Sequence, residues 1–74
     1  MAKSDYKVVF EDDDRMNDFV HILYAYLSSY RERMKNCDYF ARKNVLYVKT
    51  ARYTCVDNFV QNFAWLYGGK VIEL

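Results

Sequence analysis

The 74-residue sequence predicts an α+β domain, a ferredoxin-like β-α-β-β-α-β sandwich whose four-stranded antiparallel sheet carries two helices on one face. Two segments repeat apolar residues at helical spacing, and four short segments are rich in β-branched and aromatic residues. These segments follow one another in the order strand, helix, strand, strand, helix, strand. The two halves of the chain also echo each other at an offset of 40 residues, with Asn17–Val20 matching Asp57–Val60. Such an echo is typical of two related β-α-β halves.

The first and longer helical pattern spans Asp12–Met34. Its apolar residues are spaced by alternate steps of four and three and predict one core-facing stripe. The stripe consists of Met16, Val20, Leu23, Leu27, Tyr30 and Met34, with Phe19 and Tyr26 on its flank. Asp12 or Asp13 can cap the start of this helix, since a carboxylate there accepts hydrogen bonds from unpaired backbone N–H groups.

The second helical pattern spans Cys55–Tyr67. Thr54 and Asp57 have the spacing of a capping box at its start, and Gly68 supplies the residue that ends a helix in the left-handed conformation. The predicted core stripe consists of Val56, Phe59, Val60, Phe63 and Tyr67, flanked by Ala64 and Leu66. Leu23 and Val60 are therefore expected at the centres of the two helical stripes.

Four segments have the composition of strands, and residues 1–5 before them are expected to be flexible. The strands are Tyr6–Phe10, Cys37–Arg42, Val45–Thr50 and Lys70–Leu74. The middle two form a hairpin through Lys43 and Asn44, where Asn44 is expected to take a positive φ. The first and third strands are the most apolar, so they should be central in the sheet, and the last suits an edge. No proline or Gly/Ser-rich linker divides residues 1–74, which indicates a single domain.

Composition and cysteine usage narrow the function classes. The small core relies on eight Tyr, five Phe and one Trp, and a homodimer is an alternative source of stability.

Cys37 and Cys55 have neither metal nor redox spacing, which favours reduced thiols in the cytoplasm. No segment approaches the length of a membrane span. His21 lies on the polar side of its helix without a ligand or catalytic partner at readable spacing, so the sequence predicts no metal, no cofactor and no enzyme.

The basic middle of the chain favours RNA or single-stranded DNA as one partner. Residues 31–52 hold seven basic and two acidic side chains, although the net charge of the whole chain is only +1. Aromatic and basic residues alternate there in the manner of sheet-based RNA binders. The candidates are Tyr39, Arg42, Lys43, Tyr47, Lys49 and Arg52. If Phe40 faces the helices, Tyr39, Tyr47 and Lys49 share the open face of the sheet.

Trp65 favours a protein partner, and this is the preferred function. Helical spacing places it opposite the apolar stripe, among Asn58, Gln61 and Asn62, and Trp is strongly enriched at interface hot spots. Asp12 and Asp13 add an anionic surface that suits a basic partner. The sequence thus predicts a small binding or regulatory protein of the inhibitor or adaptor type, with self-association as a further alternative.

Overall fold

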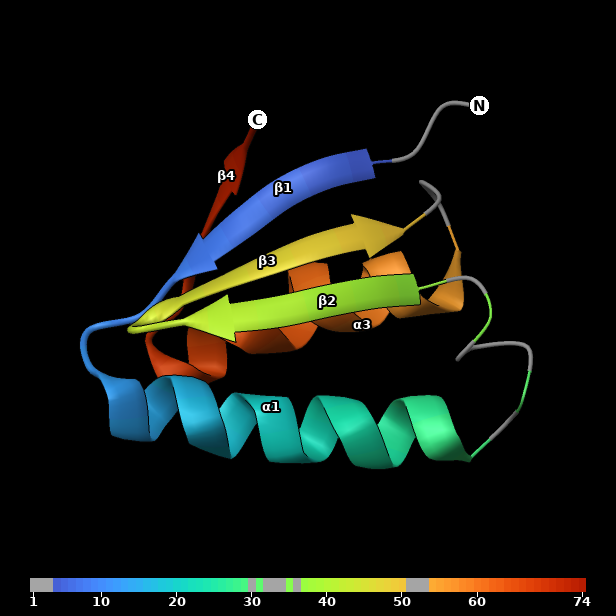
Figure 1. Ribbon diagram of the computed structural model, residues 1–74, viewed down its shortest axis with the longest axis horizontal. Coiled ribbons are helices and arrows are strands. Elements are labelled where there is room, and N and C mark those ends of the chain that lie inside the picture. Colours follow the sequence, from blue (N-terminus) through green and yellow to red (C-terminus); the bar gives the residue numbers. More distant parts are fainter. Residues whose placement is uncertain (1–3, 30, 32–34, 36, 51–53) are drawn as a thin grey trace.

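The computed structural model describes residues 4–29, 31, 35, 37–50 and 54–74, and it shows a four-stranded antiparallel sheet with two helices (Figure 1). The predicted α+β class and the order of the elements are confirmed. The elements are β1 (Ser4–Val9), α1 (Asp13–Ser28), β2 (Cys37–Arg42), β3 (Val45–Thr50), α3 (Cys55–Phe63), the 3₁₀ helix η1 (Ala64–Tyr67) and β4 (Lys70–Glu73).

The strands lie in the order β2-β3-β1-β4, so the first and third strands are central and β4 is at an edge, as their composition predicted. Because residues directly opposite each other share a face, the register determines which side chains meet. Tyr6 lies opposite Val48 and Val8 opposite Leu46, and all four are buried beneath the helices. The odd-numbered residues of β1 and β3 therefore form the open face.

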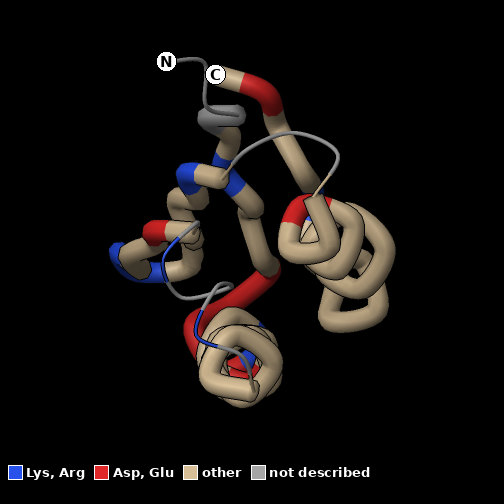
Figure 2. The backbone as a smooth tube through the Cα atoms, turned by 90° about the vertical axis from the view of Figure 1, so that its right-hand side faces the viewer, with Lys and Arg blue, Asp and Glu red and all other residues tan. Residues whose placement is uncertain are grey.

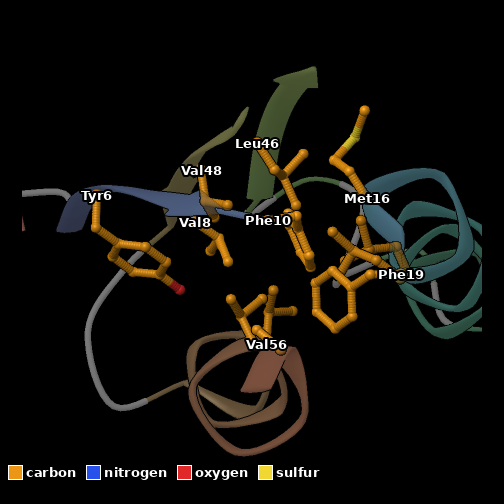
Figure 3. Packing of buried hydrophobic residues seen from close by; sticks show 12 residues of the cluster. Tyr6, Val8, Phe10, Met16, Phe19, Leu46, Val48 and Val56 are labelled. Carbon is orange, nitrogen blue, oxygen red and sulfur yellow. The ribbon is translucent and has the colours of Figure 1, made fainter. Parts of the chain in front are cut away.

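The core fills the space between this sheet face and the helices (Figure 3). Its fully or almost fully buried members are Tyr6, Val8, Phe10, Met16, Phe19, Leu23, Leu27, Leu46, Val48, Val56, Val60 and Ala64. Leu23 and Val60 are both inaccessible, which confirms their predicted positions. Phe19, expected only on the flank of its stripe, is central instead: its ring centre lies 5.7 Å from that of Phe10 and 5.8 Å from that of Tyr67.

Helix α1 begins as predicted but ends earlier. Asp12 caps it, since its Oδ1 accepts a 2.8 Å hydrogen bond from the Arg15 backbone N–H. At the other end the Ser28 hydroxyl donates to the Tyr24 carbonyl and the Ser29 hydroxyl to the Ala25 carbonyl. Serines that bond back to carbonyls in this way are poor helix formers, which is consistent with an end here. The predicted stripe residues Tyr30 and Met34 lie outside the described residues.

The second helix also begins as predicted, with Thr54 Oγ1 accepting a 3.2 Å hydrogen bond from the Asp57 N–H. Its last turn is not α-helical, however, because η1 replaces it and ends at Gly68 with φ +78°. A 3₁₀ helix has three residues per turn, so side-chain directions shift from those expected for an α-helix. Leu66, assigned to the flank of the stripe, lies on η1 and is 55% exposed. Phe63, assigned to the stripe, is the last residue of α3 and is 42% exposed.

The strand ends and the hairpin differ in detail from prediction. Ser4 and Asp5 belong to β1 rather than to a flexible end, while residues 1–3 lie outside the described residues. The positive φ of the hairpin falls on Lys43 (57°), not on Asn44. Asn44 is instead held by the chain that follows β1: its Nδ2 donates to the Phe10 carbonyl (2.7 Å) and its carbonyl accepts from the Phe10 N–H (2.9 Å).

Candidate functional site

Exposed amide and apolar side chains gather on the outer side of α3 and η1. We call this set the helical surface, and it consists of Asn58, Gln61, Asn62, Phe63, Trp65 and Leu66. Trp65 is 65% exposed, which confirms its predicted orientation. The ring sits on η1 rather than on an α-helix, and it still lies away from the core.

A groove of about 270 Å³ runs beside this surface, between α1 and α3. Its lining consists of Tyr26, Cys55, Asn58, Phe59, Asn62 and Phe63. Tyr26 from α1 stacks on Phe59 from α3, with ring centres 4.1 Å apart and planes at 13°. The Tyr26 hydroxyl also donates a 3.3 Å hydrogen bond to the Cys55 carbonyl. The two helices thus hold an apolar groove whose rim carries two amides that can both donate and accept hydrogen bonds.

The acidic run Glu11–Asp14 lies where the chain passes from β1 into α1 (Figure 2). Two of its carboxylates form ion pairs within the chain, since Arg15 Nε lies 3.5 Å from Glu11 Oε1 and 3.7 Å from Asp12 Oδ2. A Cβ added to Gly68 would lie 3.2 Å from Glu11 Oε1, so the end of η1 is next to this run. Asp12 and Asp13 are therefore at the same end of the molecule as η1. Asp12 serves first as a helix cap, which leaves Asp13 as the more available carboxylate.

The prediction for the open face is wrong by one residue in β2. Tyr39 lies opposite Val48, is half-buried and packs against the core, whereas Phe40 lies opposite Tyr47 on the open face. Burial, together with nearby Cys37 and Tyr24, raises the pKa of the Tyr39 phenol above its ordinary value. Tyr39 and Phe40 are both suitable strand residues, so composition alone did not determine which one faces the helices.

Phe40 and Tyr47 form a stacked pair on the open face, with ring centres 4.8 Å apart and planes at 13°. Phe40 is 58% exposed, so its outer ring face is accessible. Both rings, with Lys49, border a shallow hollow of about 420 Å³. Its lining is completed by Tyr6, Val48 and Leu74.

Basic side chains share the open face with this aromatic pair, as does the acidic Asp38, which lies opposite Lys49. Lys7 lies opposite Tyr47, Lys70 opposite Val9, and Arg42 opposite Val45. We call the whole set the open-face patch: Lys7, Phe40, Arg42, Tyr47, Lys49 and Lys70. Lys43 is exposed at the adjacent turn, and Arg52 lies outside the described residues. The sequence prediction omitted Lys7 and Lys70, although alternation with the core residues of their strands could have revealed them.

The described residues include neither a cluster of metal ligands nor a helix able to span a membrane. No three His, Cys, Asp or Glu side chains there are grouped as a metal ion would require. None of the helices formed by these residues combines the length and the apolar character of a membrane span. His21 is exposed on α1.

No protein-family model, curated protein or solved structure matches the chain.

Proposed function

We propose that this chain is a small binding or regulatory protein, of the inhibitor or adaptor type, that acts on a protein partner by surface complementarity and without catalysis. The observation that carries this proposal is Trp65, whose side chain is 65% exposed on an ordered element. Phe63 and Leu66 are exposed in the same short segment. Because a small domain gains stability by burying such side chains, their joint exposure favours an interface that a partner covers.

The groove beside the helical surface suggests how a partner would dock. An apolar side chain of the partner would enter between α1 and α3, against the stacked Tyr26 and Phe59 rings. Asn58 and Asn62 at the rim would then pair with polar groups that the contact removes from water. Trp65 would be covered by the partner's adjoining surface. The amides supply specificity in this arrangement, and the rings supply most of the buried apolar area.

The test is affinity capture from cell extract, with and without nuclease, using the wild type and two variants. Trp65→Ala should weaken capture of the specific partner by about 2 kcal/mol or more, roughly thirtyfold in affinity. The matched control is Tyr24→Ala, which removes an aromatic ring of similar exposure from α1. As the chain has one Trp, its fluorescence should shift to the blue in the complex. Equal capture by Trp65→Ala and the wild type would contradict the proposal.

A second candidate function, binding of single-stranded nucleic acid, is favoured by the open-face patch. Its aromatic pair could stack on an unpaired base through the outer face of Phe40, and four cations lie on the same face of the sheet. Tyr47→Ala or Phe40→Ala should then weaken binding by about 1–3 kcal/mol. If all four cations contact phosphates, the logarithm of affinity should fall with the logarithm of salt at a slope of about −3.

Mobility shifts with random single-stranded RNA and DNA over a salt series test this second candidate. Phe63→Ala is the control, because it removes an exposed ring from the opposite side of the molecule. Failure to bind any oligonucleotide at low salt would eliminate nucleic acid as the ligand. A partner that is captured after nuclease treatment and lost with Trp65→Ala would support the first proposal alone.

We further propose a ferredoxin-like architecture and a cytoplasmic location. The architecture is supported by the β-α-β-β-α-β connectivity together with the central positions of β1 and β3, which two interlocked β-α-β halves produce. The location is supported by the cysteine usage of the sequence, which lacks disulfide-like or metal-like spacing.

A further inference from the structure

Strand β2 lies at an edge of the sheet, and among the described residues it pairs with β3 alone. Its six residues, Cys37–Arg42, include no proline, and the chain as a whole has none. A six-residue edge without proline is a template for pairing with another strand unless other devices prevent it.

The open-face side chains of β2 read acid, aromatic, base, in the order Asp38, Phe40 and Arg42. All three are exposed. Asp38 lies opposite Lys49 of β3 in the same chain, but within the described part of the chain neither Asp38 nor Arg42 comes within ion-pair distance of an opposite charge. The spacing is symmetric about Phe40. An identical strand running in the opposite direction would therefore present a base to each acid and an acid to each base.

We propose that β2 pairs with β2 of a second copy of this chain, antiparallel about a two-fold axis at Phe40, to form one eight-stranded sheet. In this register Asp38 of each copy lies opposite Arg42 of the other, and the two Phe40 rings meet at the axis. Opposite charges and aromatic rings placed directly across an antiparallel ladder both stabilise it. The outer face of Phe40, 58% exposed in the single chain, becomes covered, so the dimer and a base stacked on Phe40 exclude each other.

The backbone of the hairpin is compatible with this register. Arg42 and Val45 close a two-residue loop, and such a closing pair exchanges backbone hydrogen bonds. By alternation, Phe40 directs its backbone groups toward β3, whereas Tyr39 and Ala41 direct theirs toward the outer edge. Tyr39 of one copy can then exchange hydrogen bonds with Ala41 of the other. The Phe40 residues form a non-hydrogen-bonded pair, the kind in which side chains approach most closely.

Neighbouring registers are less favourable. An axis at Tyr39 places Asp38 opposite the Phe40 ring of the other copy, so the carboxylate has no basic partner on that copy and faces only Lys49 of its own chain. An axis at Ala41 places Arg42 opposite Phe40 and shortens the ladder, and it leaves Asp38 beyond the paired residues. Of these three registers, only the axis at Phe40 places each Asp38 and each Arg42 opposite a group of opposite charge on the other copy.

Charge exchange provides the first test, read by sedimentation equilibrium over a concentration series. The wild type should approach twice its 8.9-kDa chain mass. Asp38→Arg or Arg42→Asp alone opposes like charges twice per dimer, so each should raise the dissociation constant by about tenfold or more. A mixture of the two single variants should form a heterodimer, and the double variant should recover the homodimer. A monomeric wild type, or single variants that dimerise as well as the wild type, would overturn the proposal.

Cross-linking tests the register directly and does not depend on the charge variants folding. In a Cys37→Ser/Cys55→Ser background, Phe40→Cys should form an intermolecular disulfide on mild oxidation, because the two positions meet at the axis. The matched control is Lys49→Cys, an exposed position one strand further in, which should remain unlinked. Equal cross-linking at both positions, or none at residue 40, would overturn the proposed register.

This self-association is independent of the proposed protein partner, because β2 and the helical surface lie on different elements. Trp65→Ala should weaken partner capture about thirtyfold and leave the dimer intact, whereas Asp38→Arg should weaken the dimer about tenfold and leave partner capture unchanged. Loss of the dimer in Trp65→Ala would place self-association on the helical surface and overturn the assignment to β2. Far-UV circular dichroism of each variant establishes that the fold is retained.

Discussion

The two adjacent glycines after η1 should respond very differently to the same substitution. Gly69 is buried, and a Cβ there would lie 2.6 Å from Val8 Cγ1 and 2.7 Å from Phe10 Cε2. Carbon atoms pack best at about 3.5–4.0 Å, so two core side chains would have to move by about 1 Å. Overpacking of this kind costs about 1–3 kcal/mol. We therefore expect the overpacking in Gly69→Ala by itself to lower the free energy of unfolding by about 2 kcal/mol.

Gly68 supplies the matched comparison. Its φ of +78° is unfavourable for alanine by about 1–2 kcal/mol, but its nearest neighbour would be the end of the exposed Glu11 side chain, which can move. Both substitutions also restrict the unfolded chain, which offsets about 0.4–1 kcal/mol in each. After this offset the net loss should be about 0.5–1 kcal/mol for Gly68→Ala and about 1–1.5 kcal/mol for Gly69→Ala, so the loss at Gly69 should be the larger one.

Reversible urea denaturation followed by far-UV circular dichroism measures both values. If the urea dependence stays constant, the shift in midpoint reports the change in stability. Equal losses at the two positions, or a larger loss at Gly68, would refute the close packing of Gly69 against β1. A loss of cooperativity confined to Gly69→Ala would still support it, because the added carbon would have disrupted the core.

Three other predictions concern the core, the hairpin and alkaline pH. Leu23→Ala should cost about 2–5 kcal/mol, since Leu23 is inaccessible, and a loss below about half a kcal/mol in urea denaturation would show that its stripe does not face the core. Lys43→Gly should raise the free energy of unfolding by up to about 1 kcal/mol, because φ is +57° there. Lys43→Ala removes the charge but not the strain, so it should give no such gain. The raised pKa of Tyr39 means that the folded state favours the neutral phenol. The contribution of this phenol to the free energy of unfolding is therefore fully present below about pH 10 and is lost as pH rises through the folded pKa. Tyr39→Phe should make this alkaline loss shallower, and a pH profile equal to that of the wild type would contradict the assignment.

Local signals in the sequence were sufficient to predict the helices and strands and to predict which of their residues are buried in much of the core. Helical periodicity identified Leu23 and Val60 as stripe centres, because a 3.6-residue repeat places apolar residues on one face whatever that face contacts. The caps at Asp12 and Thr54 depend on side chains only three residues away, so they too could be predicted. The same reasoning predicted the exposure of Trp65.

Tertiary structure decided whatever depends on residues distant in the chain. Tyr39 and Phe40 fit a strand equally well, and only the pairing of β2 with β3 beneath α1 turned Tyr39 inward and Phe40 outward. Asn44 was drawn into hydrogen bonds with Phe10, 34 residues away, and the positive φ fell on Lys43. A strand alternates with period two, so a change of one residue exchanges its faces, and no signal within β2 itself could determine that choice.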